Sequence, residues 1–280
     1  MLSSNRDQYS KKRRNKRILQ CSVVGVFVIS VISLASYISH RPDIRISKVE
    51  LSGGVLVTEV DIASETLSFV SGSYLWLFPK NNVFWYPRKA LSEHLKVLFK
   101  RIDTINIHLK DFYTLSVDIK ERKPVAIWCD TLPNVEPNKE PATNRPKCYF
   151  VDQNGAIFSE APNFSGDAYF KYYGLVATDT PIGSYYISST TKFGEISNFV
   201  EDIRRLSLQP LYIVGKNEGE FILTLSSGGQ IYFDTKESLT KTGMNLESLL
   251  RTPDFATTTG NSSIDYVDLR YGNKLFYKLR

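Results

Sequence analysis

The longest apolar run of the chain occupies residues 18–38 and holds no charged side chain. At ~1.5 Å of rise per residue, a helix of this length reaches ~31 Å, which matches the ~30 Å hydrocarbon layer of a bilayer. A helix satisfies its own backbone hydrogen bonds and can therefore cross that layer. The pattern predicts a transmembrane helix. The alternatives are a cleaved signal peptide, whose apolar run is normally shorter, and a buried soluble helix, which is rarely apolar on all sides.

Alternating apolar and polar positions after this run predict the strands of a small domain over residues 44–122. One strand is expected at 44–51, with a bulge where the apolar phase slips at 47–48. Two further strands are expected at 105–109 and 115–119, joined as a hairpin.

Two helices are predicted between the first strand and this hairpin. The first starts at Thr58, whose T-E-V-D run resembles a capping box. Its apolar stripe follows helical spacing at Val60, Ala63, Leu67 and Val70. The second starts near Pro87, a residue favoured in the first turn of a helix. Its apolar stripe is Leu91, Leu95 and Leu98, with Phe99 beside it. The resulting β-α-α-β-β order predicts an α+β domain with both helices on one face of the sheet.

Residues 123–280 have a different pattern, with short apolar segments separated by turn residues. This pattern predicts a second domain, a mixed β-sheet with flanking helices. Strands are expected at 124–128, 148–151, 172–175, 184–187, 211–214, 221–225, 230–233, 264–269 and 274–278. Helices are expected at 193–206 and 236–250.

Charge is distributed unevenly along the chain. Residues 1–43 carry eight Lys or Arg and two Asp, an excess of +6 that equals the formal charge of the whole chain. The rest is neutral overall and therefore has no field suited to a nucleic acid backbone. Six cations of the basic tail (1–17) directly precede the apolar run: Lys11, Lys12, Arg13, Arg14, Lys16 and Arg17. By the positive-inside rule and attraction to lipid headgroups, the tail is expected in the cytoplasm and the bulk of the chain on the other side.

Three cysteines occur in the chain, and Cys21 lies within the apolar run. Cys129 and Cys148 lie in the part expected outside the cytoplasm, where disulfides persist. We predict that they pair across the Pro-rich loop 131–147. The alternatives are two unpaired thiols, or Cys129 as a nucleophile, which would need an activating base.

No motif for catalysis, metal binding or cofactor binding is found in the sequence. The three histidines, His40, His94 and His108, lack Cys or acidic neighbours at metal-ligand spacing. Gly-rich phosphate loops and the nucleophile and zinc motifs of hydrolases are also missing. We therefore expect a protein that is not an enzyme and that has no cofactor, metal or small-molecule substrate.

Aromatic residues are dense at 74–86, where six occur: Tyr74, Trp76, Phe78, Phe84, Trp85 and Tyr86. The favoured interpretation is core packing between the two helices. The alternative is a surface for a membrane interface or a protein partner, because Trp and Tyr favour both.

The last predicted hairpin offers a candidate interaction site. If strand 274–278 lies at the edge of its sheet, its free backbone groups can accept a strand from another chain. The residues expected to bind are Tyr271, Gly272, Asn273, Lys274, Leu275, Phe276 and Tyr277. The alternative is an ordinary edge strand protected by its lysines.

Three motifs, in order behind a single apolar span, resemble the bacterial cell-division family FtsQ/DivIB. Residues 121–128 read E-R-K-P-V-A-I-W and are similar to the run that ends the family's polypeptide-transport-associated (POTRA) domain. Residues 151–158 resemble its V-D-x-x-G-x-x-F hairpin, and residues 266–271, Y-V-D-L-R-Y, resemble a late strand. The departures are a longer spacer before Cys148, the cysteine pair itself, and larger residues at 275–277.

The resemblance implies a bitopic scaffold of the divisome in the bacterial cell (inner) membrane, at the division septum. A POTRA domain (44–122) would be followed by a domain (123–280) whose last sheet edge holds FtsB, and FtsL with it, together with contacts to other divisome proteins. Tyr271 corresponds to a partner-binding tyrosine of the family. The rival functions are a membrane-anchored extracytoplasmic hydrolase and a POTRA-type accessory of protein translocation.

Overall fold

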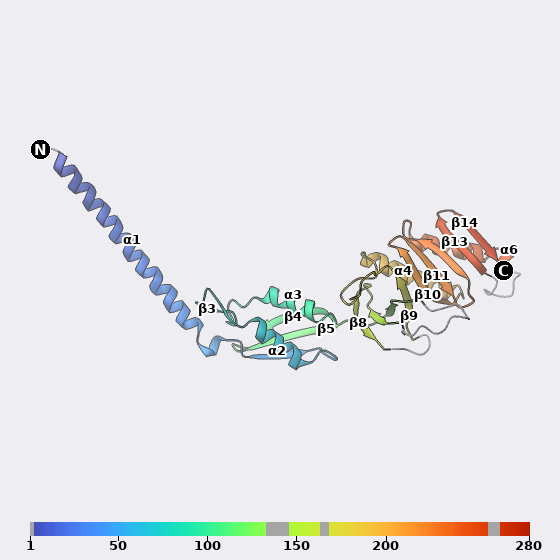
Figure 1. Cartoon of the computed structure of the whole chain (residues 1–280), viewed down its shortest axis with the longest axis horizontal. Helices are drawn as coiled ribbons and strands as arrows, with labels where there is room; N and C mark the ends of the chain where they lie inside the picture. The colour runs from blue at the N-terminus through green and yellow to red at the C-terminus, as the bar shows by residue number, and fades with distance from the viewer. Residues whose placement is uncertain (1–2, 133–145, 163–167, 257–263) are drawn as a thin grey trace. The chain divides into compact units, whose positions relative to one another are not determined.

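The computed structural model describes residues 3–132, 146–162, 168–256 and 264–280 (Figure 1). The chain folds as two compact units, Met1–Glu121 and Arg122–Arg280. The boundary expected from the sequence, between 122 and 123, lies one residue later. Both units are of the α+β class, and each is described by itself.

The first unit begins with helix α1 (Ser3–Ser39), followed by the 3-10 turn η1 (Pro42–Ile44). Within α1, residues Asn15–Ser39 are long and apolar enough to cross a membrane, and the most apolar part of this segment is not buried inside the protein. The predicted span at 18–38 lies inside this segment.

A three-stranded sheet with two helices forms the rest of the first unit. Its elements are β1 (Lys48–Ser52), α2 (Glu59–Phe69), α3 (Arg88–Leu98), β4 (Ile102–Leu109) and β5 (Thr114–Glu121). The strand order is β1-β5-β4, with β1 parallel and β4 antiparallel to the central β5. Between the helices lies a small hairpin of β2 (Ser73–Tyr74) and β3 (Phe78–Pro79).

One hydrophobic core joins both helices to the sheet of this unit. Alternate residues of β5, Leu115, Val117 and Ile119, face the helices and are buried. The intervening positions are more polar, as a sheet with one covered face requires. Helices α2 and α3 contribute to this same core and therefore cover the same face of the sheet.

Two positions of the expected helical stripes are wrong. Val60 is exposed, because α2 begins at Glu59 after its cap Thr58 and buries Ile62 and Thr66 instead. Leu98, the last residue of α3, is exposed, whereas Phe99, which we expected in the same stripe, packs against the core.

The first strand is shorter than expected and begins only at Lys48. Residues 44–46 instead bond to the loop before α3: Ile46 N–H donates to the Asn81 carbonyl at 2.7 Å, and Val83 N–H donates to the Ile44 carbonyl at 3.1 Å. At the slip in the apolar pattern, the N–H groups of Ser47 and Lys48 both donate to the Tyr113 carbonyl, at 3.0 and 3.1 Å. Two residues therefore face one partner residue there, as the predicted bulge requires.

In its described residues, the second unit contains a nine-stranded mixed sheet with helices. Its strands are β6 (Ala126–Cys129), β7 (Cys148–Val151), β8 (Ile157–Ala161), β9 (Phe170–Gly174), β10 (Pro210–Asn217), β11 (Glu220–Leu225), β12 (Gln230–Asp234), β13 (Ile264–Tyr271) and β14 (Lys274–Leu279). Its helices are α4 (Thr190–Arg205), α5 (Leu239–Leu250) and the short α6 (Pro253–Ala256). The strand order is β14-β13-β12-β11-β10-β9-β6-β7-β8.

Helices α4 and α5 pack on one face of this sheet. Residues of both helices belong to a single core with inward side chains of strands β6 to β13, and Phe199 of α4 contacts Phe233 of β12 with ring centroids 4.9 Å apart. The other face carries a smaller cluster around Ile127 and Tyr173. The predicted strand at 184–187 is wrong: this segment makes only an isolated bridge, Ala156 with Tyr185.

The aromatic stretch at 74–86 does not fill the space between α2 and α3 as we expected. Trp76 is 93% exposed and Phe84 is 68% exposed. Packing between the helices is provided by aliphatic residues instead, among them Ile62, Leu91 and Leu95, which are buried. The expectation of a core role is therefore wrong for the four exposed rings, Tyr74, Trp76, Phe84 and Trp85, whereas Tyr86 does pack against the core.

Candidate partner-binding edge

The predicted interaction site lies on the β13–β14 hairpin. Among the strands that the structure describes, β14 has a single neighbour, β13, and therefore forms one edge of the sheet (Figure 1). The two strands are antiparallel, with Val267 opposite Tyr277 and Asp268 opposite Phe276. The expectation that residues 274–278 end the sheet is confirmed.

The two faces of β14 have different roles. Leu275 and Leu279 pack against the core under the sheet, and Tyr277 contacts Phe255 of α6 with ring centroids 5.3 Å apart. On the other face, Phe276 is 51% exposed and Tyr271 is 57% exposed. Their rings meet edge to face at 5.3 Å. One side of the strand therefore anchors it, and the other presents an aromatic pair to solvent.

The turn of the hairpin is held against helix α5. Gly272 has a φ of +65°, a conformation that favours glycine, and an added Cβ would lie 3.2 Å from Glu237. Asn245 donates its side-chain N–H to the Gly272 carbonyl at 3.1 Å. The turn that carries Tyr271 is thus attached to the helix layer.

An ion pair on β13 supports the exposed aromatic pair. Arg270 donates to both carboxylate oxygens of Asp268, at 2.9 and 2.6 Å, and its guanidinium lies over the rings of Tyr232 and Tyr271, at 5.3 and 5.9 Å. Burial opposes the ionisation of Asp268, but the hydrogen bonds and charge of Arg270 outweigh it and lower its pKa. The same contacts raise the pKa of Arg270.

The two edges of the sheet differ in how they are covered. At the β8 edge, Ile157 N–H donates to the Ser184 carbonyl at 2.9 Å, and the Ile157 carbonyl accepts from Gly183 at 2.7 Å. Irregular chain therefore covers the start of that edge. On β14, Lys278 bonds Asp265 of its own hairpin at 2.8 Å, which raises the pKa of Lys278.

An edge strand of this kind can bind an extended segment of another chain. In an antiparallel edge strand, alternate residues direct their N–H and C=O groups away from the neighbouring strand. An extended segment of another chain can bond to these groups, and neighbouring side chains select its sequence. Exposed Tyr and Phe are residue types that anchor interfaces. The hairpin can therefore bind a strand, with Tyr271 and Phe276 as anchors.

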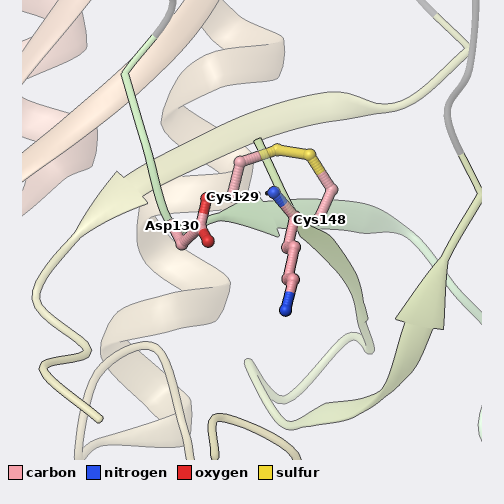
Figure 2. The surroundings of a disulfide bond; sticks show 4 residues. Cys129, Asp130 and Cys148 are labelled. Atoms are coloured by element: carbon pink, nitrogen blue, oxygen red, sulfur yellow. Dashed lines mark hydrogen bonds between the residues drawn. A yellow bond between two sulfur atoms is a disulfide. The ribbon is translucent and has the colours of Figure 1, made fainter. Parts of the chain in front are cut away.

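The predicted cysteine pair forms a disulfide at the other end of the sheet. Cys129 and Cys148 lie opposite each other on β6 and β7, with a Cα–Cα distance of 4.1 Å (Figure 2). Next to it, Asp130 N–H donates to the Lys147 carbonyl at 3.1 Å, and Lys147 N–H donates to the Asp130 side chain at 3.0 Å. These bonds close the base of the loop. We expected the disulfide to clamp the Pro-rich loop 131–147, and residues 133–145 of that loop lie outside the described ranges.

Residues of the first two motifs have identifiable structural roles. Arg122 pairs with the buried Asp152, which also accepts backbone hydrogen bonds from Asn154 and Ala156 at 2.8 and 2.9 Å. Trp128 donates its ring N–H to the Gly174 carbonyl at 2.9 Å. Within the second unit, residues of these motifs therefore attach the segment before β6 to the turn between β7 and β8, and attach β6 to the end of β9.

The remaining candidate residues lie apart from this edge. Lys11, Lys12, Arg13, Arg14, Lys16 and Arg17 all belong to α1, before its apolar run. The histidines each have a local partner: His94 contacts Glu65 at 2.6 Å, His108 contacts Asp118 at 3.2 Å, and His40 contacts the Ser36 carbonyl at 2.8 Å. Within the described ranges, no three His, Cys, Asp or Glu side chains are grouped so as to hold a metal ion.

A hollow of about 880 Å³ in the second unit lies between α4 and the strands around β9. Among the described residues that line it, the one carboxylate is Glu201, which pairs with Arg204. A hydrolase that uses two carboxylates would need a second one facing it.

Two residues of this site were not predicted from the sequence. Arg270 lies over the exposed ring of Tyr271 and also over the ring of Tyr232, so Tyr232 supports the edge through Arg270. Alternation along β13 indicates that Asp268 and Arg270 share a face, but the pairing of β12 with β13 cannot be read from either segment alone.

No protein-family model matches this chain, and no curated protein matches its sequence.

Proposed function

We propose that this chain is a membrane-tethered, non-catalytic adaptor of the bacterial divisome, which binds FtsB of the FtsB–FtsL pair, or their equivalents, outside the cytoplasm. In this proposal α1 spans the inner membrane with the basic tail in the cytoplasm. The adaptor then connects early division proteins to septal wall synthesis.

One observation carries the proposal: β14 is an edge strand with Tyr271 and Phe276 exposed beside it. A bound strand of FtsB would extend the sheet by hydrogen bonding to the outward backbone groups of β14. The aromatic pair would then supply the side-chain contacts that distinguish this strand from others.

The motifs that resemble the FtsQ/DivIB family add support from the residues themselves. Asp268 and Arg270 of Y-V-D-L-R-Y form the ion pair beneath Tyr271, and Asp152 of V-D-x-x-G anchors Arg122 of the preceding motif. Each of these motif residues thus makes an ion pair or ring contact in the folded chain.

We also propose that the β-α-α-β-β part of the first unit is a POTRA-type interaction module. Its element order and its strand order β1-β5-β4, with both helices on one face, support this proposal. Its function would be recruitment to the septum through protein contacts near the membrane.

The test is a titration of the full chain, held in lipid nanodiscs, with the FtsB–FtsL ectodomain pair encoded in the same genome. Tyr271→Glu is expected to weaken binding by ~30-fold, because an anchoring aromatic residue typically contributes ~2 kcal/mol and a charge in its place must be desolvated.

Tyr185→Glu is the matched control, because Tyr185 is 46% exposed beside the opposite edge of the same sheet. It should leave the affinity unchanged, and circular dichroism should show both variants folded. Equal affinities of Tyr271→Glu and the unmodified chain would exclude this site.

A further inference from the structure

The β2–β3 hairpin and the loop before α3 expose a group of large apolar side chains. Trp76 is 93% exposed and Leu75 is 83% exposed. We call the exposed set the aromatic patch: Tyr74, Leu75, Trp76, Leu77, Phe84 and Trp85. Isolated exposed apolar residues are common, but a contiguous group of this kind marks an interaction surface.

The patch is contiguous rather than scattered. The rings of Phe78 and Trp85 meet edge to face at 5.5 Å, and Trp85 lies 6.3 Å from Phe84. Tyr74, Phe78 and Trp85 line a shallow apolar hollow of about 250 Å³. The hairpin and the loop therefore form one surface.

The tip of the hairpin holds its two most exposed residues in a costly conformation. Leu77 N–H donates to the Tyr74 carbonyl at 3.0 Å, which closes a turn around Leu75 and Trp76. Both central residues have positive φ, +48° and +59°. Turns of this kind favour Asn and Gly, so the turn itself does not explain Leu and Trp at these positions. Their large apolar side chains call for another explanation.

The position of the patch supplies that explanation, because it is bonded to the end of α1. The Ser36 hydroxyl donates to the Leu77 carbonyl at 2.6 Å. The buried Asn82 donates its side-chain N–H to the carbonyl and the hydroxyl of Ser39, at 3.1 and 3.2 Å. These bonds fix the hairpin within one helical turn of the end of the apolar segment Asn15–Ser39.

Cations surround the patch at the same end of α1. Arg41 and Arg45 follow the helix, and Lys80 follows the hairpin with its ammonium group 5.7 Å from the Tyr74 ring. The nearby acid Asp43 pairs with Arg41 at 3.8 Å. Aromatic rings flanked by Lys and Arg are the composition that proteins place at the boundary between acyl chains and headgroups.

We infer that the aromatic patch inserts into the membrane interface on the side where α1 emerges, and so holds the first unit against the lipid. The occupant of the patch is the phospholipid bilayer itself. The inference rests on α1 crossing that bilayer and is independent of the partner bound at β14. It assigns Leu75 and Trp76 to the acyl-chain boundary and Arg45 and Lys80 to the phosphates.

The test uses the tryptophan fluorescence of the full chain in nanodiscs that hold one copy each. The discs contain phosphatidylethanolamine and phosphatidylglycerol with bromine on acyl-chain carbons near the headgroup, which quenches tryptophans at that depth. Two of the three tryptophans, Trp76 and Trp85, belong to the patch, and Trp128 is buried in the second unit. The emission of the first two should be lost, and that of Trp128 should remain.

Two variants make this result interpretable. Trp76→Phe with Trp85→Phe keeps the patch apolar and leaves Trp128 as the one fluorophore, and its emission should be insensitive to bromine. Leu75→Ser should reduce the quenching of Trp76. Val55→Ser is the control, because Val55 is 85% exposed but follows the end of β1 farther along the chain from α1.

The inference is overturned if brominated lipid leaves Trp76 and Trp85 unquenched while aqueous iodide quenches them. That outcome would mean that the patch binds a protein partner or a second copy of this chain. Neither is present in a disc that holds a single copy. Loss of FtsB–FtsL binding without a change in lipid quenching would affect only the proposed function.

Discussion

Glu121 shows how a single side chain positions a loop of the first unit. One of its carboxylate oxygens accepts hydrogen bonds from the backbone N–H groups of Val55, Leu56 and Val57, at 2.7, 2.8 and 2.9 Å. Burial opposes the ionisation of Glu121, but these three hydrogen bonds outweigh it and lower its pKa below the ordinary value of 4.5. The charged form is therefore the one that stabilises the loop after β1.

Glu121→Gln is expected to lower the free energy of unfolding of the first unit by ~1–3 kcal/mol, because hydrogen bonds to a charged acceptor become bonds to a neutral one. Urea unfolding monitored at pH 7 measures this loss. Glu93→Gln, at an exposed position of α3, should change stability little. A loss of the same size in both variants would contradict the role given to Glu121.

The same carboxylate predicts how stability depends on pH. Because its pKa is lowered in the folded state, its contribution is present above the unfolded value of 4.5 and is lost as the pH falls through the folded pKa. The unmodified chain should therefore lose stability below pH 4.5 more steeply than Glu121→Gln. Parallel curves for the two proteins, measured by thermal unfolding between pH 3 and 7, would show that Glu121 is not responsible.

At the scale of elements, the disulfide joins β6 and β7 across a long connection. The cysteines are 19 residues apart, so in the chain-entropy model the bond stabilises the second unit by ~3 kcal/mol. Reduction with dithiothreitol should lower the free energy of unfolding by about this amount. Cys129→Ala with Cys148→Ala should reproduce the loss and make the protein insensitive to the reductant. A double variant as stable as the oxidised chain would refute this.

The sequence was a good guide to elements whose partners are near in the chain. Strand β7 lies at the expected residues 148–151, and the cap at Thr58 accepts the expected hydrogen bond from Asp61 N–H. It was a poor guide where the backbone of a segment bonds to residues that are distant in the sequence. Residues 44–46 bond to the loop at 81–83, and residues 184–187 meet the start of β8 without forming a strand.

The candidate edge was predictable only in part for the same reason. Alternation identifies the β13–β14 hairpin, and its position at the end of the sheet is confirmed. The support from Tyr232 depends on the parallel pairing of β12 with β13, a contact between segments separated by α5. Exposure of the aromatic patch was only the second interpretation, because composition alone does not tell a core ring from an interfacial one.

At the scale of the whole molecule, each unit presents one kind of contact. The first unit carries the apolar helix α1 and the aromatic patch bonded to its end. The second unit carries the edge strand β14 with its exposed aromatic pair. In the proposed adaptor, the first unit would attach to the membrane and the second would capture the partner, and neither needs catalytic groups.

Hydrogen–deuterium exchange of the full chain in nanodiscs tests the capture of a partner strand most directly. On addition of the FtsB–FtsL ectodomains, alternate backbone amides of β14 should become protected, because a bound strand bonds the outward N–H groups. The amides of β8, at the other edge, should exchange as before. Saturating partner that leaves β14 unprotected, or that protects a different surface, would contradict the account.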